Sequence, residues 1–125
     1  MTYRELQRQM KKFTDEQLDQ DIMIYDSLEK EYFPINIDEI HYSNGEDNLE
    51  DNQPFLILWG NMSYLTYRQL IEHSKYFTKE QLDQTVTIFD VDDDEYFPCN
   101  GISITQEDGV LDKKHIILII KKDEE

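Results

Sequence analysis

Two copies of one segment make up much of this chain, and the duplication constrains the fold more than any other feature. Residues 2–34 and 66–98 align at an offset of 64 residues without a gap, with 18 identities over 33 positions. Two copies of one sequence are expected to form the same helices and strands. We therefore predict one globular domain built from two repeats, residues 1–64 and residues 65–125.

Each copy begins with sequence signals for two helices. Residues 2–5 and 66–69 have the Thr-x-x-Glu/Gln spacing of a capping box, in which both side chains bind free backbone N–H groups. Apolar residues then recur at steps of three and four, which predicts a helix with one buried face. A second box at residues 14–17 and 78–81 predicts a very short helix after the first.

Three strands are predicted after the helices of each copy. Alternation of apolar residues with other residues indicates the first strand. The second strand has a proline near its start, which places that end at a sheet edge or a bulge. An uninterrupted apolar run indicates a third strand covered on both faces. The predicted strands are residues 22–25, 32–40 and 55–59 in the first copy and residues 86–89, 96–105 and 116–120 in the second. This alignment makes the loop at residues 44–53 three residues longer than its counterpart.

The predicted fold class is α+β. It is a tandem duplication of an α-α(short)-β-β-β unit with pseudo-twofold symmetry, in which a mainly antiparallel sheet or sheets carry the helices on one face. The linker at residues 60–65 is too short to let the halves separate freely. Whether the repeats share one sheet or form two sheets packed face to face is left open by the sequence.

The chain is strongly acidic along its whole length. The net charge of −16 is divided into −9 for residues 1–64 and −7 for residues 65–125. Such a surface repels nucleic acids and anionic membranes, whose binding depends on Lys and Arg, and it favours a basic partner or cations. We therefore expect no direct contact with nucleic acid or membrane.

A cytoplasmic location is expected from three sequence features. The first residues contain no apolar segment of the secretory type, and the longest apolar runs are far shorter than the roughly 20 residues that cross a bilayer. The single cysteine, Cys99, cannot form a disulfide within the chain, which fits a reducing compartment.

The acidic run at residues 90–95 is the strongest candidate for local chemistry. Asp90, Asp92 and Asp94 are oxygen donors of the kind that bind Ca²⁺ or Mg²⁺. The spacing does not match an EF-hand loop, and Lys30 stands where Asp94 stands in the second copy. We therefore favour an acidic hairpin turn and predict no metal site.

Histidine and cysteine do not form recognisable catalytic or metal-binding patterns. His41, His73 and His115 are too scattered to present a ligand pair, and solvent-facing or rim positions are expected. Cys99 aligns with Ile35, which indicates that it fills a hydrophobic slot. Phosphate-binding glycine loops and nucleophile elbows are absent from the sequence.

Charged residues that recur in both copies are expected to stabilise the fold. Each of the two arginines is predicted to reach a carboxylate of its own repeat. The recurring pairs are Arg4 with Arg68, Glu16 with Glu80, and Asp19 with Asp83.

The succession TYR-x-L, FT-x-EQLDQ and EYFP, present in both copies, resembles a motif of short uncharacterised acidic proteins of bacteria and phages. The motif covers about half of each copy. The resemblance implies a recurrent module and assigns no catalytic residues.

The sequence predicts a small acidic binding protein without enzymatic activity or cofactor, acting as a monomer or homodimer. Its expected partner is a basic protein or the basic site of a nucleic-acid-binding complex, and a phage-type inhibitor or nucleic-acid mimic is the sharper form. Two alternatives are a module that self-associates through sheet edges and a protein that binds a small ligand or divalent cation. The predicted partner-binding residues are Tyr42, Glu46, Asp47, Glu50, Asp51, Asp92, Asp93, Asp94 and Glu95.

Overall fold

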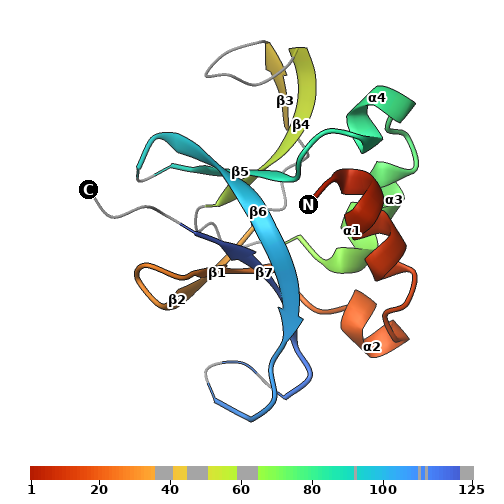
Figure 1. Ribbon diagram of the computed structural model, residues 1–125. Coiled ribbons are helices and arrows are strands. Elements are labelled where there is room, and N and C mark those ends of the chain that lie inside the picture. Colours follow the sequence, from red (N-terminus) through yellow and green to blue (C-terminus); the bar gives the residue numbers. More distant parts are fainter. Residues whose placement is uncertain are drawn as a thin grey trace.

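The fold of the chain is given by a computed structural model (Figure 1). The structure describes residues 1–35, 41–44, 51–58, 65–91, 93–109, 111 and 113–121. In that part of the chain, no helix combines the length and apolar composition needed to cross a membrane.

Each half of the chain begins with two short helices and continues in strands. The first half contains α1 (Tyr3–Met10), α2 (Asp15–Leu18), β1 (Met23–Asp26), β2 (Glu31–Pro34), β3 (His41–Asn44) and β4 (Asp51–Leu58). The second half contains α3 (Tyr67–Ser74), α4 (Lys79–Leu82), β5 (Thr87–Asp90), β6 (Glu95–Ile104) and β7 (Ile116–Ile120). All four helices begin at the predicted capping boxes, with a threonine hydroxyl accepting the N–H three residues later.

The described strands form one curled seven-stranded sheet in the order β2-β1-β7-β6-β5-β4-β3. The pairs β1 with β7 and β4 with β5 are parallel, and the other neighbours are antiparallel. The last strand of each half therefore lies beside the first strand of the other half. Figure 1 shows the four helices gathered at one end of the curl.

The predicted α+β fold of two repeated units, with mainly antiparallel sheets and helices on one face, is wrong. The observed fold is a curled mixed sheet resembling half of a barrel, with four small helices. The prediction failed because hairpins inside each repeat can be read from local sequence, whereas parallel pairing joins residues far apart in the chain. Strand exchange between the halves joins both repeats in one sheet, which is one of the two arrangements that the sequence left open.

The strand register also corrects the alignment of the two copies. Ile24 pairs with Leu118 and Ile88 pairs with Leu56, so the last strands correspond at an offset of 62 residues and not at the predicted 61. The antiparallel pairs His41–Phe55 and Ser103–Ile117 carry the same offset into β3 and β6.

The length difference between the copies consequently moves to another place in the chain. Five residues, 36–40, separate Ile35 from His41, whereas three residues separate Cys99 from Ser103. The segments that join β3 to β4 and β6 to β7 correspond without insertion, so the prediction of a longer loop at residues 44–53 is wrong. Residues 36–40 lie outside the described part of the chain.

Four residues outside glycine adopt the left-handed backbone conformation, and they form two equivalent pairs among the described residues. Lys30 (φ 57°) corresponds to Asp94 (φ 54°) at an offset of 64, and Asn52 (φ 60°) corresponds to Lys114 (φ 65°) at an offset of 62. Side chains with a Cβ adopt such angles rarely. The shared strain shows that both copies form the same turns despite different residues at these positions.

The two prolines of the second strand occupy the two places that the sequence allowed. Pro34 lies in β2, the outermost strand on one side of the described sheet, where its missing N–H costs no ladder bond. Pro98 lies within β6, directly before the register shift between Cys99 and Gly101. The equivalent prolines therefore lie on an edge strand in one copy and beside a bulge in the other.

The core lies between the helices and the inner side of the curled sheet. Tyr3 and Tyr67 are its largest buried side chains, and their hydroxyl groups donate to the backbone carbonyls of Pro54 at 2.6 Å and Ile116 at 2.8 Å. Their rings pack edge-on against aromatic rings of the other copy, Phe77 and Phe13 respectively. Each tyrosine thus connects a helix, a strand and the opposite half.

Replacing Tyr3 or Tyr67 by Phe should lower the free energy of unfolding by about 1–2 kcal/mol, because a buried carbonyl loses its donor. The two losses should be similar, since the two sites are equivalent. Urea unfolding followed by circular dichroism measures both values. A neutral effect of either variant would contradict the assigned hydrogen bond.

The same tyrosines should make the protein unfold at high pH. Burial raises the pKa of Tyr3 and of Tyr67 well above the ordinary tyrosine value of about 10. Their contribution to stability is complete below that ordinary value and is lost as the pH rises toward and through the folded-state pKa. Stability measured from pH 8 to pH 12 should fall, and the double Phe variant should show a shallower decline.

Candidate functional site

Two equivalent acidic turns lie at the end of the sheet opposite the helices. β1 is parallel to β7, and β7 and β5 are each antiparallel to β6, so β1 and β5 run in the same direction. The turn after β1 (residues 26–31, the first turn) and the turn after β5 (residues 90–95, the second turn) therefore share one end (Figure 1). Three inter-strand steps separate them, roughly 14 Å along the sheet.

The first acid of each turn holds the turn together. Asp26 Oδ1 accepts the backbone N–H groups of Leu28 at 2.9 Å and Glu29 at 3.3 Å. Asp90 Oδ1 accepts the N–H of the equivalent residue, Asp93, at 3.4 Å. Both aspartates are buried, so their recurrence reflects turn structure. The predicted acidic hairpin turn at residues 90–95 is confirmed by the pairing of β5 with β6.

The exposed residues of the two turns differ in charge. The second turn exposes the carboxylates of Asp93, Asp94 and Glu95, whereas the first turn exposes a lysine between two glutamates, at residues 29–31. Each turn also exposes an aliphatic residue by 40%, Leu28 in the first and Val91 in the second. The second turn is therefore the more negative of two otherwise similar surfaces.

Aromatic rings lie beside both turns on the outer side of the sheet. Tyr25 pairs with Tyr32 across the first hairpin, with ring centroids 5.1 Å apart, and Phe89 pairs with Tyr96 across the second, at 4.7 Å. The four rings are half-buried, and none belongs to the core cluster or packs against it. Along β1 and β5, Tyr25 and Phe89 alternate with Ile24 and Ile88, which belong to the core cluster.

The structure divides the predicted partner-binding residues between two ends of the molecule. Asp93, Asp94 and Glu95 lie together on the second turn. Tyr42, exposed by 46%, pairs with Pro54 near the start of β4, which is the helix end of the sheet, and its ring lies 6.4 Å from that of Phe77. Asp51 begins β4 at the same end. The remaining predicted residues, Glu46, Asp47, Glu50 and Asp92, lie outside the described residues.

The alternative cation site at Asp90, Asp92 and Asp94 is not assembled by the described residues. The buried Asp90 carboxylate accepts the backbone N–H of Asp93, whereas Asp94 is exposed and has a left-handed backbone conformation. Within the described part of the chain, no three carboxylates, histidines or cysteines come together as a metal would require. Asp92 falls outside that part, so the metal prediction stays untested there.

The histidines lie apart from one another, and the cysteine lies in the core. His73 is exposed, the ring of half-buried His41 lies 5.8 Å from Phe55, and a ring nitrogen of His115 lies 3.0 Å from the Asp21 carbonyl oxygen. Cys99 is fully buried in the core, and burial raises the pKa of its thiol. The predicted hydrophobic slot for Cys99 is confirmed.

The recurring arginines bind carboxylates of the opposite copy, which corrects the prediction that each binds within its own repeat. Arg4 Nε lies 2.8 Å from Asp83 Oδ1, and Arg68 Nε lies 2.7 Å from Asp19 Oδ1. Helix α1 lies beside α4, and α3 lies beside α2. Each arginine therefore reaches the aspartate at the C-terminal end of the short helix of the other copy. Such exposed pairs add little stability individually.

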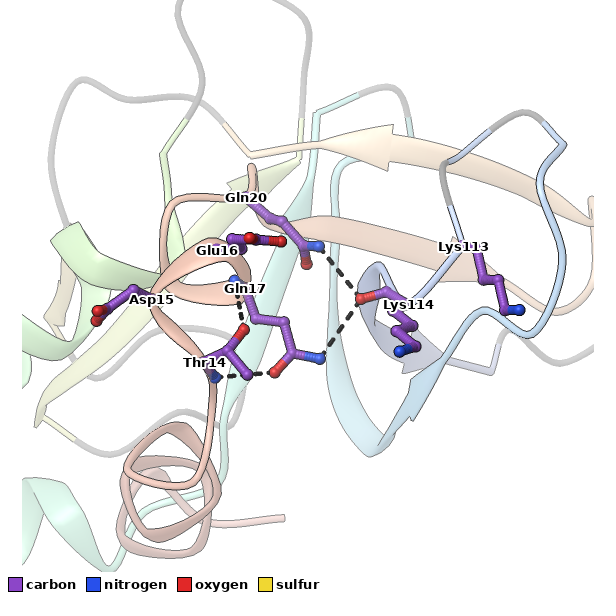
Figure 2. Close-up of a pocket in the computed structure, with 7 residues that line it drawn as sticks. All are labelled: Thr14, Asp15, Glu16, Gln17, Gln20, Lys113 and Lys114. Carbon is purple, nitrogen blue, oxygen red and sulfur yellow. Dashed lines mark hydrogen bonds between the residues drawn. The ribbon is translucent and has the colours of Figure 1, made fainter.

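A shallow pocket lies between α2 and the segment before β7, with a volume of ≈ 380 Å³. Figure 2 shows Gln17 and Gln20 pointing at the Lys114 carbonyl oxygen, to which their amide groups donate at 3.5 and 3.2 Å. Gln17 also closes the capping box with Thr14. These amides are occupied in docking α2 onto the strand layer, so they are not available for a ligand in this arrangement.

Sequence reasoning missed this pocket because its lining joins residues about a hundred positions apart. Its remaining lining, Asp15, Glu16 and Lys113, mixes both signs of charge. The basic pair at residues 113–114 in an acidic chain was the available signal. The first copy has Asp51 and Asn52 at the positions equivalent to Lys113 and Lys114, so the basic lining occurs beside α2 and is not repeated beside α4.

Comparisons with family models, with curated proteins and with solved structures find no match to this chain. The resemblance to short acidic bacterial and phage proteins stays a prediction.

The exchange of ion pairs between copies predicts which aspartate responds to which arginine. Hydrogen bonding to Arg68 lowers the pKa of Asp19, and hydrogen bonding to Arg4 lowers the pKa of Asp83. Arg68→Gln should raise the pKa of Asp19 and leave that of Asp83 lowered, and Arg4→Gln should do the reverse, as carboxylate NMR titration can measure. These pairs stabilise the fold above the ordinary aspartate pKa, and the contribution is lost as the pH falls through the lowered values.

Proposed function

We propose that this chain is an acidic, non-enzymatic binding protein that occupies a basic surface of another protein. The observation that carries the proposal is the second turn, where three exposed carboxylates, Asp93, Asp94 and Glu95, extend from a hairpin whose outer side carries half-buried aromatic rings. Carboxylates steer a basic partner and aromatic rings supply contact area.

The placement of the polar groups further supports a binding role. The buried aspartates of both turns are engaged in turn geometry, the buried cysteine lies in the core, and the amides of the pocket bind backbone carbonyls. Among the described residues of the second turn, the exposed side chains are the three carboxylates and one aliphatic residue, Val91. This combination suits recognition of a basic protein surface.

The test compares two variants that remove the same charge from opposite ends of the molecule. Asp93→Asn, Asp94→Asn and Glu95→Gln together neutralise the second turn, and Asn at position 94 tolerates the left-handed backbone. The control, Glu16→Gln, Glu80→Gln and Glu107→Gln, neutralises three exposed acids of the helix end. Both variants have the same net charge, so a difference between them reports on the turn.

Affinity purification from the source cells should recover a basic protein with the unmodified chain and with the control. The turn variant should retain about tenfold less of it, if each neutralised rim charge is worth about 0.5 kcal/mol. Added double-stranded DNA should displace a partner whose nucleic-acid site is being occupied. Equal retention by both variants, or a partner that resists molar salt, would rule out this electrostatic binding mode.

A further inference from the structure

The outer side of the sheet carries a three-ring cluster beside the second turn. Phe55 lies edge-on to Tyr96 with centroids 5.2 Å apart, Phe89 lies 4.7 Å from Tyr96, and Phe55 lies 6.3 Å from Phe89. The rings come from three adjacent strands, β4, β5 and β6. Phe55 is buried and the other two are half-buried, so the cluster forms a packed platform with partly open rings.

The equivalent place in the other half of the sheet has diverged. Tyr25 and Tyr32 repeat two of the rings, but Ile117 stands where Phe55 stands in the platform. The adjoining first turn also carries Lys30 in place of Asp94. Phe55 and the additional acid therefore occur together, on neighbouring strands of the same side of the sheet.

The platform lies apart from the main core. Phe55, Phe89 and Tyr96 are absent from the core cluster formed by the helices and the inner side of the sheet, and they are not among the residues packed against it. In Figure 1 the helices gather at the opposite end of β5 from its turn. Phe89 and Tyr96 are the partly exposed rings of the platform, whereas Phe55 is buried with its ring 5.8 Å from that of His41.

Chemistry and charge together favour one kind of occupant. The planar guanidinium group of arginine stacks on aromatic rings and binds carboxylates with two N–H groups, whereas lysine offers a compact, strongly hydrated charge. The platform supplies aromatic rings. The second turn, which joins β5 to β6, supplies the carboxylates of Asp93, Asp94 and Glu95. The whole chain carries a net charge of −16. A surface of this composition is expected to favour arginine over lysine.

We propose that the platform and the second turn bind an arginine-bearing segment of a basic protein, with a guanidinium group on the Phe89–Tyr96 rings and carboxylates of the turn around it. This inference rests on the proposed function and specifies the chemistry of its partner. It assigns the specificity for arginine to the rings and the general attraction to the acids.

The experiment measures binding of two fluorescent peptides to the full chain by anisotropy. One peptide alternates Gly with Arg, and the other alternates Gly with Lys at the same length and charge. The arginine peptide should bind about fivefold to tenfold more tightly, which is the range expected for a partly desolvated cation–π contact. Equal affinity for the two peptides overturns the inference and requires no variant.

Variants of the rings then locate the site. Tyr96→Leu should remove most of the preference for arginine, while Tyr96→Phe, which keeps the ring, should retain it. Tyr32→Leu is the matched control at the equivalent position of the other half, and it should leave the preference unchanged. Thermal unfolding by circular dichroism verifies that each variant is folded.

The outcomes separate the inference from the proposed function. If the neutralised second turn loses affinity for both peptides while Tyr96→Leu keeps the preference for arginine, the platform is wrong and the acidic binding mode stands. If the neutralised turn binds both peptides as tightly as the helix-end control does, the turn is not the binding surface and both proposals fail. Loss of the preference in Tyr32→Leu, but not in Tyr96→Leu, places the site in the other half and contradicts the inference.

Discussion

The two parallel strand pairs, β1 with β7 and β4 with β5, are the contacts on which the rest of the structure depends. Each joins the first strand of one half to the last strand of the other, so neither half completes its own sheet. The buried strand residues Ile24, Ile88, Leu56 and Leu118 meet across these pairs and form the centre of the core. Since hydrophobic burial supplies most of the folding free energy, the halves must fold together.

The helices reinforce the same exchange from one end of the sheet. The Tyr3 amide donates to Gln84 and the Tyr67 amide to Gln20, so each helix starts against the other copy's chain. The hydroxyl groups of the two tyrosines donate to buried carbonyl groups of β4 and β7. On the exposed side of the helices, the two arginine–aspartate pairs connect the copies. Contacts that occur twice in equivalent positions are therefore explained by the shared fold, which leaves the differences between copies as the place to seek function.

Two of those differences lie in one region. The hairpin of the second half lies beside Phe55 of β4, where the hairpin of the first half has Ile117 of β7 at the equivalent position. The turn of the second half also has additional carboxylates. Parallel alignment of β1 and β5 sets the two turns at the same end of the sheet, so they form related surfaces with different charge. A partner that contacts this end would meet one strongly acidic aromatic hairpin and one weaker copy of it.

Local sequence was enough to place the capping boxes, the short helices, the hairpin turns and the buried position of Cys99, because each depends on residues a few positions apart or on one apolar side chain. It also identified the acids of the second turn as candidates for binding. It could not place Tyr42 at the opposite end from that turn, since this depends on strand order.

The duplication by itself determined that equivalent turns recur, and the left-handed residues at equivalent positions follow from it. Only the tertiary structure decided whether each strand pairs, and each arginine binds, within its own half or with the other half. The physical reason is that two near-identical copies offer near-identical partners, so pairing within a copy and pairing between copies look alike in sequence. Packing of both halves around one core distinguishes them, and it also brings Phe55 beside Phe89 and Tyr96 to create the platform.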